Sequence, residues 1–155
     1  MSYTIGIDLG GSHVKAVVVS LEGKTLDNHN IPFDPSIRMD WGRCIKQTIN
    51  EAESKQNSPA CNIGLSAPGL AALDGSCITH MPDRLEGLVN LDWQDYLNLD
   101  QAVPVVNDGH AALLGEAWLG AAKGFKNVIL LTLGTGVGGA ALVEGKLLRG
   151  RTGKG

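Results

Sequence analysis

The sequence contains two glycine-rich segments with the same plan, one near each end of the chain. Residues 3–24 and residues 128–146 each combine an apolar run, a glycine-rich turn, a second apolar run and a closing Glu-Gly-Lys turn. Apolar runs joined by short turns that contain glycine predict β-hairpins. We therefore predict two antiparallel hairpins and, from their likeness, a duplicated fold that holds one phosphorylated ligand from two sides.

The segment between the hairpins is predicted to alternate strands with helices. Besides the hairpin strands, which are expected at 3–9, 14–21, 128–133 and 140–147, strands are expected at 25–31, 62–66 and 103–106. Helices are expected at 41–54, where apolar residues recur at helical spacing, and at 92–97 and 109–122. An antiparallel start followed by alternating strands and helices predicts a mixed sheet covered by helices, which is the layout of an RNase-H-like α/β domain.

The composition argues against several classes of protein. A chain of 155 residues with 43% hydrophobic content can form a globular core. Its net charge of −3 gives no general attraction to nucleic acids or anionic membranes. No apolar run approaches the roughly 20 residues of a membrane helix, and we expect no secretion signal at the N-terminus. We therefore expect a cytoplasmic protein that binds small molecules, with no nucleic-acid or membrane partner.

The first glycine-rich turn can bind phosphate. Gly10 and Gly11 have no Cβ atoms, so their backbone N–H groups can approach an anion closely. Ser12 and Lys15 follow the turn and are candidates for contacts with phosphate oxygens. Asp8 precedes it and is a candidate ligand of hydrated Mg²⁺, which prefers a few carboxylates and keeps its water. The alternative is a tight hairpin that simply needs glycine.

The second glycine-rich turn also matches the dinucleotide fingerprint G-x-G-x-x-G, at residues 134–139. That fingerprint requires a helix directly after it, with the pyrophosphate at the helix N-terminus. The apolar run at 140–143 is closed at once by Glu144 and Gly145, so it is too short for such a helix. A dinucleotide-binding protein is therefore the less favoured interpretation.

Four blocks of the sequence, taken in order, resemble the ROK family of sugar kinases in the actin, Hsp70 and hexokinase superfamily. The blocks are DLGGSHVK at 8–15, GLSAPG at 64–69, VNDGHAA at 106–112 and LGTGVGG at 133–139. The resemblance implies transfer of the γ-phosphoryl group of Mg-ATP to a sugar hydroxyl, usually the 6-hydroxyl of a hexose. Catalysis of this kind depends mainly on positioning and on charge stabilisation.

The resemblance also implies roles for individual residues. Asp108 matches the catalytic base, which accepts the proton of the sugar hydroxyl. Its alternative role is that of a helix N-cap, for which Asp is a favoured residue. Asn107 would hydrogen-bond the sugar, and Gly69 would allow the backbone to approach it closely. The residues of the second turn that would bind ATP are Gly134, Thr135, Gly136 and Gly138.

Two departures from the family pattern affect these expectations. Where many members carry a sugar-contacting P-N-L-x-G-W, the asparagine position is occupied here by Arg84. Arg84 is a candidate substrate-binding residue that could pair with an anion or a sugar hydroxyl, and the alternative is that it points to solvent, so the sugar stays unspecified. The family's zinc-binding cluster follows the last matching block and is not present in this chain.

We therefore expect an N-terminal lobe at 1–122 and the start of a second lobe at 123–155. We also expect a homo-oligomer, and we expect these 155 residues alone not to be an efficient kinase. The alternative is a non-catalytic sugar- or nucleotide-binding module of the same descent.

Overall fold

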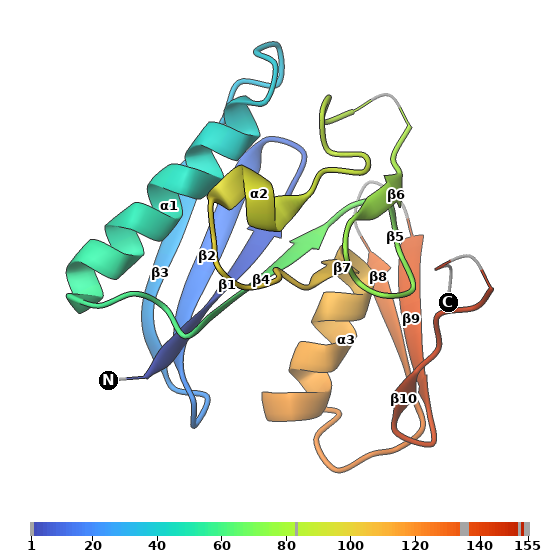
Figure 1. Cartoon of the computed structure of the whole chain (residues 1–155). Helices are drawn as coiled ribbons and strands as arrows, with labels where there is room; N and C mark the ends of the chain where they lie inside the picture. The colour runs from blue at the N-terminus through green and yellow to red at the C-terminus, as the bar shows by residue number, and fades with distance from the viewer. Residues whose placement is uncertain (1, 83, 134–136, 152, 154–155) are drawn as a thin grey trace.

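The chain folds into two main β-sheets with helix α3 (Asp108–Leu119) between them (Figure 1). The computed structural model describes residues 2–82, 84–133, 137–151 and 153. The turn at 134–136, to which the sequence assigned ATP contacts, lies outside the described residues.

The larger sheet has five strands in the order β3-β2-β1-β4-β7. Its strands are β1 (Tyr3–Leu9), β2 (His13–Ser20), β3 (Thr25–Pro32), β4 (Asn62–Ala67) and β7 (Val105–Asn107). The first three strands pair antiparallel, whereas β4 runs parallel to β1 and β7 runs parallel to β4. The predicted first hairpin and the mixed α/β sheet are therefore confirmed.

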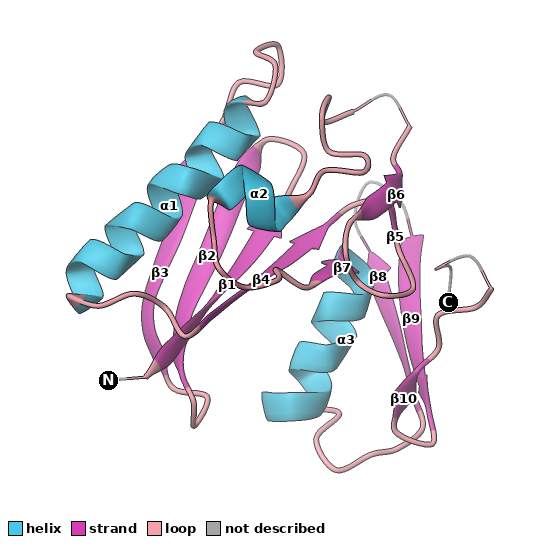
Figure 2. Ribbon diagram, viewed as in Figure 1, coloured by secondary structure: helices cyan, strands magenta, loops and turns pink. Residues whose placement is uncertain are grey.

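Helices α1 (Asp40–Gln56) and α2 (Trp93–Leu97) lie on the same side of this sheet (Figure 2). Alternate residues of β1, from Tyr3 to Leu9, join the apolar side of α1 in one buried core. The two helices meet through Trp41 and Trp93, whose ring centroids are 5.8 Å apart. The amphipathic pattern of the sequence therefore identified the correct face of α1.

The structure differs from the predicted elements in two places. The stretch between β4 and α2, predicted as loop, contains a short hairpin of β5 (Leu70–Ala71) and β6 (Ile78–His80). The predicted strand at 140–147 is two strands, β9 (Val137–Val143) and β10 (Lys146–Leu147). Glu144 and Gly145 separate them, because both residues have positive φ angles that end an extended strand.

The second main sheet is antiparallel, with the order β10-β9-β8, where β8 is Val128–Leu133. One face of this sheet packs against α3, where Leu113 meets Ala140 and Leu142 in a small separate core. The opposite face carries large apolar side chains, and no other described element buries them. These exposed residues, which we call the open face, are Ile129, Leu131, Leu133, Val137 and Val143.

The open face corresponds in register to the face that α1 covers in the first hairpin. In both hairpins a leucine before the glycine-rich turn pairs with a valine after it, Leu9 with Val14 and Leu133 with Val137. Counting back along the strand, Ile5 is therefore the counterpart of Ile129. Ile5 is 0% exposed beneath α1, whereas Ile129 is 79% exposed.

This pair predicts opposite effects of the same substitution. Ile5→Ala should lower the free energy of unfolding by about 2–5 kcal/mol, because it leaves a cavity in the core. Ile129→Ala should change it by less than about 0.5 kcal/mol, because the side chain is already in water. Urea denaturation of both variants measures this. A large loss in Ile129→Ala would mean that the open face is covered in solution.

Candidate active site

The candidate site lies where the parallel strands β1, β4 and β7 end. The register pairs Asp8 with Ser66, and Ser66 with Val106, so the second-to-last residues of the three strands lie side by side. Asn107 and Asp108 follow directly at the end of β7. Ligands of open α/β sheets bind at this carboxyl edge of the strands.

A cavity of about 260 Å³ opens at this edge. Five of the residues predicted from the sequence line it, namely Asp8, Gly10, Gly11, Arg84 and Asp108. Pro68, Met81 and Leu85 complete its wall, together with Leu9. Two carboxylates, a glycine-rich turn and an arginine that are distant in the sequence therefore share one small space.

Asp8 is held in place by Ser66, a residue that sequence reasoning had not assigned to the site. The Ser66 hydroxyl donates a hydrogen bond of 2.6 Å to Asp8 Oδ1. Ser66 is buried, whereas Asp8 is exposed toward the cavity. The only sequence signal for Ser66 was its place in the GLSAPG block at the end of β4.

The Asp8 carboxylate fits a hydrated magnesium ion better than a fully protein-coordinated metal. Among the described residues, no group of three or more His, Cys, Asp or Glu side chains is placed to hold a metal. Mg²⁺ needs no such group, because it usually keeps several waters and binds one or two carboxylates plus substrate phosphates. Asp8 Oδ2 makes no hydrogen bond within the described part of the chain and can serve as such a ligand.

Asn107, and not Asp108, caps helix α3. Its Oδ1 accepts hydrogen bonds from the backbone N–H groups of Gly109 at 2.9 Å and His110 at 3.4 Å. Its Nδ2 donates to the carbonyl of Gly69 at 2.9 Å. The alternative interpretation of Asp108 as the N-cap is therefore wrong. Asp108 is the first helical residue, its side chain is exposed, and it lines the cavity.

Gly69 must be glycine for a backbone reason. Its φ angle is +105°, and a Cβ at this position would lie 2.5 Å from the carbonyl oxygen of His80. The residue therefore allows β5 and β6 to pack tightly beside the site. Its carbonyl accepts the Asn107 hydrogen bond, so Gly69 supports the site without lining the cavity.

The remaining predicted residues lie around the cavity. Lys15 is the cross-strand partner of Asp8 on β2, and the Ser12 hydroxyl lies 2.9 Å from Nδ1 of His13. Both lie outside the cavity wall.

Gly138, predicted to bind ATP, lies on β9. The residue after it, Gly139, contacts the start of α3. A Cβ on Gly109 would be 3.5 Å from the Gly139 carbonyl oxygen. The second hairpin therefore approaches the helix end that carries Asp108.

This strand order, together with a glycine-rich turn and two acids at the carboxyl edge of the sheet, defines an actin-like ATPase fold. Comparison with known proteins identifies the family. The model of the ROK family matches residues 4–155. The glucokinase of Halalkalibacterium halodurans is 35% identical over 96% of this chain and 46% of its own length. The β-glucoside kinase of Listeria innocua is 34% identical over 92% of this chain and 47% of its own.

A solved structure gives the same result. The ROK family glucokinase from Streptomyces griseus, in complex with glucose and AMPPNP, matches with a TM-score of 0.78 at 30% identity. The match covers 99% of this chain and 48% of that one. The chain therefore belongs to the ROK family. It spans about half the length of the curated relatives that it matches. None of the described helices is long and apolar enough to cross a membrane.

The double role of Asn107 predicts a measurable loss of stability on its removal. Asn107→Ala loses a helix cap and the bond to Gly69, so the free energy of unfolding should fall by about 1–3 kcal/mol. Asn107→Asp keeps the cap acceptor and loses only the donor, so its loss should be smaller. Chemical denaturation of both variants tests this, and equal losses would contradict the two-part assignment.

His110 gives a second prediction, in the pH dependence of stability. The side chain of His110 is buried, and burial lowers its pKa. The charge of Arg149 lowers the pKa further, while Asp108 opposes the change. The unfolded chain therefore binds the proton more tightly, and this contribution to stability is lost as the pH falls below about 6.5 toward the lowered pKa.

The loss cannot exceed about 1.4 kcal/mol per pH unit for one group. His110→Gln should flatten the stability profile between pH 7 and pH 5, as measured by urea denaturation at each pH. A variant with the same slope as the original chain would contradict the assignment.

Proposed function

We propose that this chain forms the first lobe, and the start of the second, of an ATP-dependent sugar kinase that transfers the γ-phosphoryl group to a hexose hydroxyl. The observation that carries this proposal is the shared cavity in which Asp8, the Gly10–Gly11 turn and Asp108 meet. A phosphoryl acceptor, a phosphate chain and a metal must come together in phosphoryl transfer, and these residue types suit the three tasks.

Asp108 acts as the general base in this proposal. Its Oδ1 accepts a hydrogen bond of 2.8 Å from the N–H of Gly109, which fixes the carboxylate at the start of α3. Its side chain lines the cavity, so the carboxylate can accept the proton of the attacking hydroxyl. Asn107 keeps one amide hydrogen beyond the bond to Gly69, and Arg84 lines the same cavity as Asp108 and offers guanidinium donors, so both can orient the sugar.

The other side of the cavity would bind Mg-ATP. Asp8, oriented by Ser66, would hold the hydrated ion, which supplies neutralisation of the charge on the phosphates. The N–H groups of the first turn would contact the phosphate chain, with Ser12 and Lys15 behind them. The second turn, at 134–136, together with Gly138, would contact ATP from the second lobe.

The open face supports a boundary between the two lobes after residue 122. In the first hairpin, the equivalent face is buried by α1, and the far edge of β1 is paired with β4. In the second hairpin, β8 lies at the edge of its sheet among the described strands, and its face is bare. We infer that a further helix and a parallel strand complete this lobe in the active kinase. A non-catalytic binding module is the alternative, and the retained Asp108 argues against it.

A measurement of kinase activity tests whether Asp108 is the general base. We would combine the chain with the segment of Halalkalibacterium halodurans glucokinase that follows the part matched here, and measure ADP release with glucose. Asp108→Asn should lower kcat by about 10²–10⁴-fold, because general-base catalysis is lost. The control Asp100→Asn, an exposed acid outside the cavity, should leave kcat unchanged.

Two outcomes would contradict the proposal. Equal turnover by Asp108→Asn and the original chain would remove Asp108 as the base. Efficient turnover by the 155-residue chain alone, as a monomer, would overturn the need for a completed second lobe. Sedimentation of the same sample also tests the predicted homo-oligomer.

A further inference from the structure

A second and larger cavity, of about 630 Å³, adjoins the one that holds Asp8 and Asp108. The common wall of the two cavities consists of Gly11, Met81, Arg84 and Leu85. Small-molecule sites usually measure about 300–1,000 Å³. The smaller cavity, at about 260 Å³, lies below this range, and the larger cavity lies within it. A ligand whose reacting end lies at Asp108 therefore has room to extend past the common wall.

Among the described residues, one hydroxyl and three charged side chains line the larger cavity. The Ser36 hydroxyl donates a hydrogen bond of 2.6 Å to Asp34 Oδ1. Nε of Arg38 lies 2.8 Å from Oε1 of Glu86, and the two side chains form an ion pair. The last of the four is Arg84, whose side chain makes no hydrogen bond or ion pair with any residue that the structure describes. Arg84 therefore brings a positive charge without a counter-ion to the wall.

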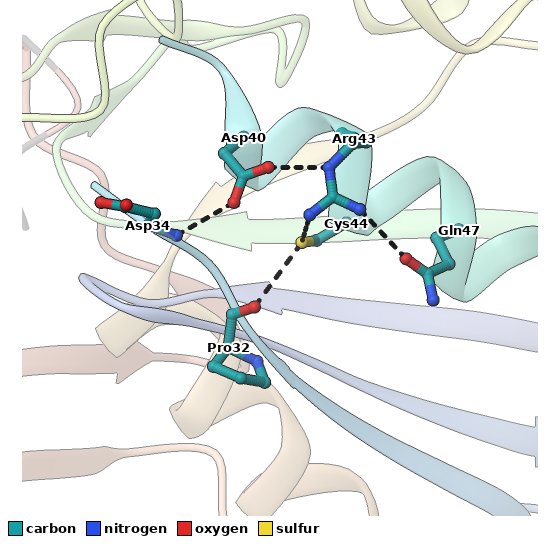
Figure 3. Close-up of polar contacts among 6 residues, drawn as sticks. All are labelled: Pro32, Asp34, Asp40, Arg43, Cys44 and Gln47. Carbon is teal, nitrogen blue, oxygen red and sulfur yellow. Dashed lines mark hydrogen bonds and ion pairs between the residues drawn. The ribbon is translucent and has the colours of Figure 1, made fainter. Parts of the chain in front are cut away.

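Arg43, at the start of α1, already has partners for its charge (Figure 3). Its Nε donates a hydrogen bond of 2.7 Å to Asp40 Oδ1, and its Nη1 donates one of 3.3 Å to Gln47. Asp40 Oδ2 accepts a hydrogen bond of 2.9 Å from the backbone N–H of Asp34, which fixes the loop at 33–39. Arg43 also holds the pKa of Asp40 below its usual value, so this carboxylate is ionised at neutral pH. Arg43 is therefore occupied in anchoring one wall of the larger cavity.

The loop that carries Arg84 is held in one conformation. Leu85 and Gly87 follow it with left-handed φ angles of 52° and 87°. A Cβ on Gly87 would lie 2.9 Å from Sδ of Met39, so the loop packs closely against this residue. Leu88 is fully buried, and its N–H donates a hydrogen bond of 3.0 Å to the carbonyl of Leu85. Strained residues of this kind persist where the surrounding structure fixes them, often at ligand sites.

An arginine without a counter-ion in a cavity wall is suited to bind an anion. Its guanidinium group has five N–H donors in a planar fork, which matches two oxygens of a carboxylate or a phosphate. In the smaller cavity, Asp8 and Asp108 repel an anion that has no metal of its own. In the larger cavity, the one acid among the described lining residues is Glu86, which is paired with Arg38. The favourable place for an anion is therefore the larger cavity, beside Arg84.

We propose that the phosphoryl acceptor is an anionic hexose, whose phosphate or carboxylate group lies in the larger cavity and pairs with Arg84. The proposal rests on the proposed function, because it assumes that the reacting hydroxyl faces Asp108. That hydroxyl oxygen bonds to the γ-phosphorus of ATP while the bond from this phosphorus to the leaving ADP oxygen breaks, and the hydroxyl proton passes to Asp108. The anionic group is unchanged, and it lies on a carbon remote from the reacting hydroxyl. Arg84 is therefore a specificity-determining residue for the acceptor.

The test compares the binding of glucose, α-D-glucose 1-phosphate and carboxymethyl α-D-glucoside to the 155-residue chain by NMR titration. At least one of the two anionic hexoses should bind about tenfold more tightly than glucose, because hydrogen bonds between charged groups are stronger than neutral ones. The anion with the larger gain identifies the charged group that the cavity prefers.

Two variants and a matched control assign this preference to the guanidinium group. Arg84→Met should remove the preference for the anionic hexose, and Arg84→Lys should keep part of it, because the charge remains and the fork is lost. The control is Arg151→Met, since Arg151 is also an exposed arginine and lies outside both cavities. This control should keep the full preference.

Equal affinities for all three hexoses would overturn the inference, and so would a preference that survives Arg84→Met. A preference that is also lost in Arg151→Met would show a general effect of charge and would overturn it as well. Inorganic phosphate is titrated in parallel, and binding as tight as that of glucose 1-phosphate would overturn the assignment of a sugar to this site.

These outcomes differ from a failure of the proposed function. Equal affinities leave the proposed function intact, because a hexose still binds. Failure of the original chain to bind any of the three hexoses would overturn the proposed function and, with it, this inference.

Discussion

The side chain of Asn107 connects the parts of the molecule on which the candidate site depends. Its two polar atoms bind the first N–H groups of α3 and the carbonyl of Gly69, so they join β7, the helix and the turn after β4. Because Asp108 is the next residue, this one amide sets where the proposed base lies. Asp8 is placed in the same way by Ser66, one strand away.

The two hairpins have similar strands but differ in burial and in contacts, because different elements surround them. The first is buried under α1 and paired with β4, and its turn meets two acids in a cavity. The second contacts the start of α3 through Gly139 but has an apolar face in water. In a phosphoryl-transfer site built from both turns, the open face must therefore be covered by another element before the second hairpin is held as firmly as the first.

Much of the fold could be predicted from the sequence, because its signals are local. Alternating apolar residues and glycine turns predicted β1, β2 and β8, and helical spacing predicted α1. The hairpin of β5 and β6 was missed, since two and three residues carry no periodicity. Asp8 was found because it directly precedes the first glycine-rich turn, and Asp108 was found because it lies in a sequence block that resembles the ROK family.

The partners of those two acids could not be found in this way. Ser66 lies 58 residues from Asp8 in the sequence, and only the register of parallel strands brings them together. Asn107 was expected to bind sugar, and its capping role depends on where α3 begins. The larger cavity was invisible for the same reason, because its walls are two loops joined by Arg38 and Glu86.

The most direct test of the account is where a metal–nucleotide complex binds. Mn²⁺ with AMPPNP, added to the ¹⁵N-labelled chain, broadens the NMR signals of amides near the ion. The account predicts broadening centred on residues 8–11, 66–69 and 107–109, at the carboxyl edge of β1, β4 and β7. Broadening centred elsewhere, for example at the exposed Asp95 of α2, would contradict the assignment of Asp8 and Asp108 to a phosphoryl-transfer site.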